Sequence, residues 1–489
     1  MPAILLMLVC SVGVVYGQRS IDPSGEQIPF LRSTALVAGE GSVTQTDNPD
    51  LTVLNPASVG ALQRTVLSLS YTGLTGFGRN GQGWDGHAGS IMASQPTRYG
   101  VFSGGIGVIT SGLADFDVGS GLMLSFGYSR DVWDDLLVGA GITTDFGGHG
   151  DGLAFGAGLD VGFIHSPLTL FGIEGARWGG SLRRMGYPYR PVAGVTGLPA
   201  SLTPQLGLML PLVSDGNVTL DLYTDISSPG FRDGRLSVAA DLGLFDRVSV
   251  QTGIGFSVRE LIDGDLPVQS LIPSIGINAR FTAGLPGSSD REGSLIAEQG
   301  WDRNEFAVRS AARPLYGAVW GVSTGVTASL GVADNNPPVI IVDYGDRQYI
   351  SPNNSGVQDD IVVPVEIYDE ERFLQGYRFV IEDEQGRVVR EFSARTPRPE
   401  ERSSAVFFER LTRIDTGITV PESFRWNGRS DGGSVVPDGI YEFYVEAWDD
   451  NDNRAVSDRF EVVVDLTPPS ADVSTPFGGD RVFSPDGDG

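Results

Sequence analysis

The chain has 489 residues, a formal net charge of −27 and no lysine, so all 34 of its basic residues are arginine. So acidic a protein lacks the basic patches that nucleic acid binding requires, which excludes nucleic acid as a partner. Residues 333–489 contain 32 acidic and 15 basic residues, against 29 and 19 in residues 1–332, which indicates two regions of different character. The single cysteine, Cys10, excludes a disulfide within one chain, and the three histidines lack metal-ligand spacing.

Residues 1–17 are predicted to be a secretory signal peptide. The apolar run is short and lies at the start of the chain, with Val15 and Gly17 at the small-residue positions of a cleavage site. A lipoprotein signal that uses Cys10 is the alternative, although Val9 before it fits poorly. No later stretch reaches the roughly 18 apolar residues of a membrane-spanning helix, so this exported protein would cross a membrane as strands.

Residues 18–62 alternate too poorly to form a strand, and Asn55-Pro56 is a turn former just before the first predicted strand. Residues 30–62 combine an Ala/Gly-rich stretch, a polar turn and the tripeptide Asn55-Pro56-Ala57. This segment resembles the N-terminal segment of the PorV/PorQ and FadL-like outer-membrane families. The resemblance implies a 14-stranded barrel with residues 18–62 inside it. A generic turn before a strand is the alternative interpretation of the tripeptide.

Residues 63–332 are predicted to form a transmembrane β-barrel. In residues 248–258, apolar residues occupy every second position, and mostly small or polar residues occupy the others. Residues 217–227 and 273–281 repeat this pattern and carry Asp or Arg on the polar face. Alternation over about ten residues, apolar outside and polar inside, is typical of outer-membrane barrels. A soluble β-sandwich has shorter strands and rarely buries Asp and Arg.

Counting such segments predicts about 14 strands, an even number, as is usual for bacterial barrels. The segments are residues 64–73, 86–94, 100–110, 119–129, 134–145, 152–164, 167–177, 203–213, 217–227, 233–243, 246–257, 271–282, 303–313 and 316–332. The connections after odd-numbered strands are often long, as in 74–85, 178–202 and 258–270, whereas those after even-numbered strands are mostly short. This difference predicts long loops outside the cell and short turns in the periplasm. The connection 283–302 is an exception, because it is long although it follows an even-numbered strand. Either the strand count is wrong there, or these residues form a small plug or arm.

Residues 333–338 form a polar, proline-rich linker, and the β-rich residues 339–466 predict a β-sandwich arm. Its sharpest motif resembles the FlgD-type Ig-like domain. The motif residues are Trp426, Asn427, Gly428, Asp431, Gly433, Pro437, Gly439 and Tyr441. The Gly, Asn, Asp and Pro residues supply hairpin turns. Trp426 and Tyr441 are expected to be core aromatics, with a binding role for Trp426 as the alternative.

Residues 335–356 and 466–489 share one pattern: Pro-Pro, a short β run, Gly-Asp-Arg, an aromatic residue and Ser-Pro. A repeat with a domain-sized period predicts that residues 467–489 open a further Ig-like repeat, and that the chain is a piece of a longer protein. Asp486 and Asp488 are candidate Ca²⁺ ligands in the Ig-like repeats, with a solvated turn as the alternative. No other cofactor is expected.

The sequence favours a non-enzymatic protein, because it has no G-x-S-x-G motif, P-loop or recognisable Ser/His/Asp set. The leading hypothesis is a bacterial outer-membrane protein of PorV type, embedded in outer-membrane lipid. Its barrel would anchor a periplasmic Ig-like arm that contacts envelope or secretion-system proteins. A FadL-like transporter of hydrophobic small molecules is one alternative, and a surface adhesin is another. The adhesin requires an odd strand count or a threaded arm, because an even count puts both barrel ends in the periplasm.

Overall fold

The computed structural model describes most of the chain between residues 31 and 472. The described ranges are 31–39, 41–46, 48–76, 84–113, 116–133, 135–149, 152–167, 169–190, 202–245, 247–263, 271–283, 304–315, 319–330, 336–345, 347–369, 373–395, 403–414, 417–449, 453–468 and 470–472. The predicted signal peptide 1–17, nearly all of the connection 283–302, and the Ca²⁺ candidates Asp486 and Asp488 lie outside these ranges. The chain divides into a barrel unit, residues 1–333 with 400–414, and an arm unit, residues 334–399 with 415–489.

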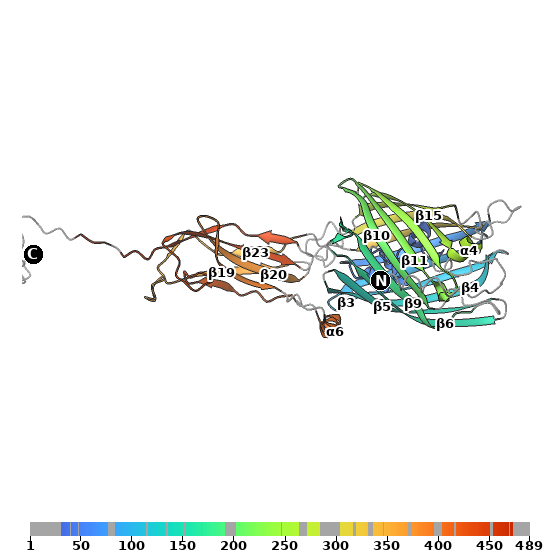
Figure 1. Ribbon diagram of the computed structural model, residues 1–489, viewed down its shortest axis with the longest axis horizontal. Coiled ribbons are helices and arrows are strands. Elements are labelled where there is room, and N and C mark those ends of the chain that lie inside the picture. Colours follow the sequence, from blue (N-terminus) through green and yellow to red (C-terminus); the bar gives the residue numbers. More distant parts are fainter. Residues whose placement is uncertain are drawn as a thin grey trace, which may run out of the picture. The chain divides into compact units, whose positions relative to one another are not determined.

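Antiparallel strands of the barrel unit close into a single ring (Figure 1). In chain order they are β1 (Thr65–Gly76), β2 (Trp84–Thr97), β3 (Gly100–Leu113), β4 (Phe116–Trp133), β5 (Leu136–His149), β6 (Gly152–His165), β9 (Arg177–Tyr187), β10 (Thr203–Asp215), β11 (Val218–Ser227), β12 (Arg235–Leu244), β13 (Val248–Ser257), β14 (Ser274–Ala283), β15 (Asn304–Pro314) and β16 (Val319–Leu330). Pairing of β1 with β16 closes the ring, from Thr65 opposite Leu330 to Gly76 opposite Val319. The predicted all-β class and 14-stranded antiparallel barrel are therefore confirmed.

The two ends of the barrel differ in their connections. We call the rim where β1 begins and β16 ends the terminal rim, and the opposite rim the distal rim. Among the fully described connections, the terminal rim has the two-residue turns 98–99 and 216–217. At the distal rim, residues 228–234 with η3 (Pro229–Phe231) connect β11 to β12, and β13 continues directly into α4 (Val258–Asp263).

The predicted seventh strand, residues 167–177, is wrong. The barrel strand at this position is β9, and residues 166–176 instead form a terminal-rim connection with a two-stranded hairpin, β7 (Thr169–Leu170) and β8 (Ile173–Glu174). Phe171, Gly172 and Gly175 have positive φ values of 54°, 80° and 73°, which turn the chain instead of extending it. The error arose because residues 169–173 are mostly apolar, whereas β9, RWGGSLRRMGY, carries arginine, serine and glycine.

The strand periodicity separates a small, polar inner face from an apolar outer face. In β14, Ser274, Gly276 and Asn278 are buried, while Ile275 and Ile277 between them are each 54% exposed. The outer face is therefore an unpaired apolar surface, whereas the inner face meets other protein groups. Such a surface suits contact with lipid hydrocarbon. No helix in the described part of the chain is long and apolar enough to span a membrane.

The arm unit contains two β-sheets that share one hydrophobic core. One sheet has the order β17 (Val339–Val342), β19 (Ile361–Tyr368), β22 (Ser423–Trp426). The other has the order β18 (Gln348–Ile350), β25 (Phe460–Val464), β23 (Gly439–Asp449), β20 (Leu374–Asp383), β21 (Val388–Arg395), and β24 (Arg454–Val456) pairs with β23. The rings of Phe379 on β20 and Phe424 on β22 stack with centroids 4.7 Å apart, so the core joins the sheets. The FlgD-type assignment stays a prediction.

The arm core yields a test of independent folding. We expect residues 335–470 to unfold cooperatively when expressed alone, and Phe443→Ala to lower the free energy of unfolding by about 3–5 kcal/mol, because it empties a fully buried ring site. Val388→Ala is the control, since Val388 is 51% exposed. Urea titration followed by circular dichroism measures both. A gradual transition without a cooperative midpoint would contradict an independently folded arm.

Candidate functional site: the plugged barrel lumen

The described residues between 31 and 59 fill the barrel lumen, and we call this segment the plug. It comprises α3 (Thr34–Gly39) and the 3₁₀ helices η1 (Pro49–Val53) and η2 (Pro56–Val59), drawn in blue within the barrel in Figure 1. Nearly all of these residues are buried. α3 packs against β13–β16, η1 against β1–β3 and η2 against β4–β6. The plug therefore contacts the wall around most of its circumference.

Two Asn-Pro pairs shape the plug. Asn48 and Asn55 have extended backbones, and their side-chain oxygens accept hydrogen bonds from Asp50 N (2.9 Å) and Ala57 N (3.0 Å). The proline after each asparagine occupies the first helical position, where no amide hydrogen is needed. Each pair therefore starts a tight turn in a confined space.

Asn55 also pins the plug to the wall. Its amide nitrogen donates to the backbone oxygens of Val43 in the plug (2.7 Å) and Phe163 on β6 (3.1 Å), and the residue is completely buried. One side chain thus satisfies an amide hydrogen and two carbonyls that have no water to bond with. Asn55, Pro56 and Ala57, singled out from the sequence, therefore lie together at a wall contact.

The glycine-rich wall leaves space for the plug. A Cβ on Gly162 would lie 2.0 Å from Asn55 Oδ1, and one on Gly139 would lie 2.4 Å from Ala57 N. Across the lumen, a Cβ on Gly276 would lie 2.4 Å from Ala38 Cβ. Side chains at these positions would displace the plug. The closeness of the plug therefore favours glycine at these three positions.

Charged side chains tie the plug to the wall at further points. The Arg32 guanidinium lies 3.4 Å from Asp145 Oδ1, and Arg184 on β9 pairs with the same carboxylate. Asp225 on β11 accepts a hydrogen bond from Val43 N (3.1 Å). The sequence analysis predicted Asp on the polar face of residues 217–227, where Asp225 lies, but did not predict Arg32, Asp145 or Arg184. The alternation of the strands indicated that charged residues face inward. It could not indicate which plug residues these charges would contact.

An apolar cluster interrupts the polar lumen near the distal rim. Leu31 of the plug packs with five buried apolar side chains of the wall and a distal connection: Leu74, Ala88, Ile109, Leu315 and Val319. Since the lumen face elsewhere carries many Ser, Thr, Asp and Arg side chains, this cluster marks a distinct environment at the distal mouth. Here the plug meets the wall by apolar contact instead of hydrogen bonds.

Exposed aromatic side chains gather near both rims. Those near the terminal rim are Tyr99, Phe171, Trp178, Phe245 and Phe281, those toward the distal rim are Phe146, Phe155, Tyr187 and Phe231, and Tyr71 and Phe126 lie nearer the middle of their strands. Aliphatic residues such as Ile91 and Leu159 are exposed between the two groups. Two aromatic girdles around an apolar band are the mark of a transmembrane barrel. The sequence analysis missed the girdles, because rim positions emerge only once strand register is known.

The structure places the remaining predicted residues as follows. Trp426 and Tyr441 are buried in the arm core with ring centroids 5.5 Å apart, Trp426 Nε1 donates to Arg429 O (2.9 Å), and Tyr441 Oη donates to Pro437 O (2.9 Å). The turn glycines Gly428 and Gly433 have positive φ values of 62° and 80°. The motif residues Asn427 and Asp431 lie between β22 and β23, and Gly439 is the first residue of β23. This arrangement orders a hairpin region and leaves neither ring available for ligand contact.

The described residues contain no group of three or more His, Cys, Asp or Glu side chains suited to a metal ion. His87 hydrogen-bonds Tyr71 Oη (2.8 Å), and His165 lies 3.0 Å from Asp135 Oδ2. Asp221 lines a polar lumen cavity of about 190 Å³ near the terminal rim, together with Arg177, Asp241 and Arg280. This cavity suits water and ions.

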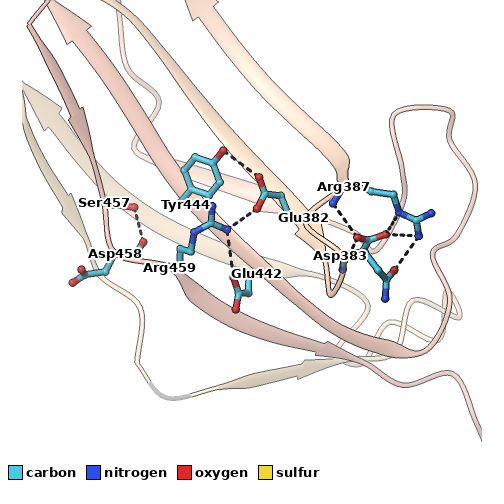
Figure 2. A network of polar contacts seen from close by, with 9 residues as sticks. Glu382, Asp383, Arg387, Glu442, Tyr444, Ser457, Asp458 and Arg459 are labelled. Carbon is cyan, nitrogen blue, oxygen red and sulfur yellow. Dashed lines mark hydrogen bonds and ion pairs between the residues drawn. The ribbon is translucent and has the colours of Figure 1, made fainter.

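Polar side chains on the arm surface form a charged network (Figure 2). Arg459 pairs with Glu382 and Glu442, and Tyr444 Oη lies 3.3 Å from Glu382 Oε1. In the β20–β21 turn, the Arg387 guanidinium donates to Asp383 (2.8 Å), which holds the pKa of that carboxyl below its ordinary value of 3.8. The Thr467 hydroxyl and the amide of Leu466 similarly hold the pKa of Asp438 below 3.8.

Comparison with solved structures finds outer-membrane proteins at low similarity. No protein-family model matches the sequence, and no curated protein matches it. The toluene transporter TbuX of Ralstonia pickettii is 11% identical, with a TM-score of 0.37, over 62% of this chain and 98% of that chain. A Pseudomonas aeruginosa FadL homologue is 11% identical, with a TM-score of 0.34, over 61% and 98%. The CymD monoaromatic hydrocarbon channel is 11% identical, with a TM-score of 0.36, over 62% and 99%.

Asn55 provides a test of how the plug is held. We expect Asn55→Ala to destabilise the plug by about 1–3 kcal/mol, because it removes the side-chain hydrogen bonds to the Ala57 amide and the Val43 carbonyl and the tie to Phe163 O. Open events should become more frequent in planar-bilayer conductance recordings. Asn217→Ala, in an exposed terminal-rim turn, is the matched control.

A second variant, at Gly162, tests whether the effect of Asn55→Ala arises from the contact between Asn55 and β6. Gly162→Ala alone should also disturb the plug, since its methyl group collides with Asn55 Oδ1. In the Asn55→Ala background the same change should have little further effect. Fully additive effects of the two substitutions would contradict the assigned contact.

The arm carboxyls give a pH dependence. Because the folded pKa of Asp438 lies below its ordinary value of 3.8, its stabilising contribution is present above that value and is lost as pH falls through the folded pKa. We expect the urea midpoint of residues 335–470 to drop between pH 5 and pH 3 (an interval of about two units around the ordinary carboxyl pKa), and to drop less in Asp438→Asn and Thr467→Val. An equal drop in all three proteins would show that Asp438 is not responsible.

Proposed function

We propose that this protein is a plugged outer-membrane channel that admits small apolar molecules, as in the FadL-like alternative. The observation that carries the proposal is the apolar cluster at the distal mouth, where Leu31 begins the described plug. A channel for ions gains nothing from an apolar seal, whereas an apolar solute finds its first favourable contacts there. The cluster is therefore proposed as the entry site.

Passage requires the plug to move, because it fills the lumen. Its described ties to the wall are hydrogen bonds, ion pairs and apolar contacts, among which those of Asn55 and Arg32 are deeply buried. A solute that binds the distal cluster competes with Leu31 for Leu74 and Ile109. Displacement of Leu31 would then loosen Arg32, the next residue, from Asp145. Entry and unplugging are thus coupled through adjacent residues.

The proposed location is the bacterial outer membrane, with the distal rim outside. Both ends of the barrel sequence, Thr65 and Leu330, lie at the terminal rim. The two-residue turns 98–99 and 216–217 at the terminal rim, against the longer connection 228–234 at the distal rim, support a periplasmic terminal rim, and the hairpin connection 166–176 is the exception to this pattern. This orientation supports a periplasmic arm over a surface adhesin.

Anchoring of PorV type is a second proposal, which does not exclude transport. It is favoured by an arm unit that has its own core, and by the acidic excess of residues 333–489. An acidic folded module is suited to basic surfaces of envelope or secretion-system proteins. In this proposal the barrel holds the arm at the membrane.

A substitution of Ile109 distinguishes the transport proposal from the anchoring proposal. We expect Ile109→Thr to slow entry of a radiolabelled medium-chain fatty acid into proteoliposomes about tenfold, because a hydroxyl enters the apolar entry site. Val108→Thr is the matched control, since the adjacent Val108 faces outward and is 50% exposed. Residues 1–333 without the arm should transport at the full rate.

Equal rates for Ile109→Thr and the parent protein would contradict an apolar entry site. Binding of envelope proteins by the arm, with no fatty-acid entry in any variant, would leave anchoring as the function.

A further inference from the structure

Helix α6 (Ser404–Thr412) lies in sequence between two arm strands, β21 and β22, yet it belongs to the barrel unit. Ser403 caps its start by accepting a hydrogen bond from Val406 N (3.3 Å). The helix packs against the end of β4 at the terminal rim (labelled in Figure 1). The sequence analysis included these residues in the arm and predicted no helix there.

Polar groups of the wall hold the C-terminal end of α6. The Tyr128 hydroxyl lies 3.1 Å from Leu411 O, and the Arg130 guanidinium donates to Arg413 O. These groups bond carbonyls that have no partner within the helix, and the positive charge of Arg130 opposes the negative end of the helix dipole. Arg130 is only 4% exposed. The helix end is thus tied to a specific place on the wall.

The aromatic residues of α6 extend the terminal-rim girdle. The Phe407 ring lies 5.9 Å from that of Trp133 at the end of β4. The next residue, Phe408, is 64% exposed. Short amphipathic helices with exposed phenylalanine lie at membrane–water interfaces. The position of α6 at the girdle is therefore an interfacial one.

A groove of about 600 Å³ lies between α6 and the outer wall. Its floor includes Val138, Ala140, Val161, Phe163 and Leu206, and Phe407 and Leu411 of α6 cover one side. Val161 and Leu206 are outward-facing, with exposures of 42% and 44%. The groove therefore opens on the lipid-facing surface and is separate from the lumen.

Strand register makes the groove continuous. Val138 lies opposite Phe163, Phe163 opposite Gly180, and Gly180 opposite Leu206. Gly180 is an outward-facing position without a side chain, flanked by Phe163 and Leu206. This missing side chain forms a depression across neighbouring strands. An elongated apolar depression suits a flexible hydrocarbon chain better than a compact ring.

We propose that this groove binds one acyl chain of a membrane phospholipid, with α6 as its cover. The occupant follows from the location, because the groove opens on the apolar band between the aromatic girdles, where lipid chains are the surrounding solvent. Its volume lies within the range of small-ligand sites. The proposal rests on the membrane location of the barrel, and it holds whether or not apolar solutes pass through the lumen.

Native mass spectrometry of the full-length protein tests the proposal. The protein is purified in detergent, mixed with phosphatidylethanolamine and released from the micelle, and retained lipid is counted. We expect one strongly retained phospholipid. Ala140→Phe, which fills the groove, and Phe407→Ala/Leu411→Ala, which removes the cover, should each lower retention about tenfold, which corresponds to about 1.4 kcal/mol.

Matched controls give the test its specificity. Ala279→Phe adds the same ring at another exposed outward alanine, on β14, and Phe408→Ala removes the exposed ring beside Phe407. Both should keep the lipid, and heat-modifiable migration on gels checks that every barrel is folded. Absence of a retained lipid, equal loss in Ala279→Phe, or displacement of the lipid by an equimolar free fatty acid would each overturn the proposal.

Discussion

The structure depends on the closure of one backbone ladder, the pairing of β1 with β16 from Thr65–Leu330 to Gly76–Val319. In hydrocarbon, an unpaired peptide group loses several kcal/mol of free energy, so strands survive in a membrane only as a closed ring. Closure fixes every strand's two faces. The outer face must then be apolar, and the inner face is left to small and polar residues that meet the plug.

The plug follows from the same constraint. A lumen lined with Ser, Asp and Arg would be open to water if nothing filled it, and the wall glycines show that this wall is shaped for a protein filling. Asn55 satisfies plug and wall carbonyls together, while Arg32 and Asp145 neutralise each other in a site with little water. At the distal end, Leu31 meets the wall by apolar contact, as Val37 and Ala38 do where they pack against Ala311. The wall therefore holds the plug by specific polar contacts along the lumen and by apolar packing at the distal mouth.

Alternation predicted the barrel because the membrane and the lumen impose opposite demands on neighbouring residues. Thirteen of the predicted strands coincide with a barrel strand over most of their length, whereas the predicted seventh strand shares only Arg177 with β9. Strand β9 was missed because its inward positions carry Arg177 and Arg183 and its outward Gly180 weakens the alternation. The Asn55 motif pointed to the plug, but the bond to Phe163 O depends on a fold that brings distant residues together. α6 escaped notice because nine residues with scattered charges resemble a loop until a wall supports them.

The position of the plug before β1 has a consequence for assembly. Residues 31–59 are translated before any strand, yet they lie within a ring whose last strand, β16, must return to the first. The pairing that seals the ring is also the one that spans the greatest sequence distance, so loop-closure entropy makes it a late event. The plug segment is therefore best placed to act as an internal template, around which inward glycines and serines find their register before the seam forms. The strands would then pair with one another around the plug. Substitutions that disturb the plug would make the pairing of β1 with β16 slow or incomplete.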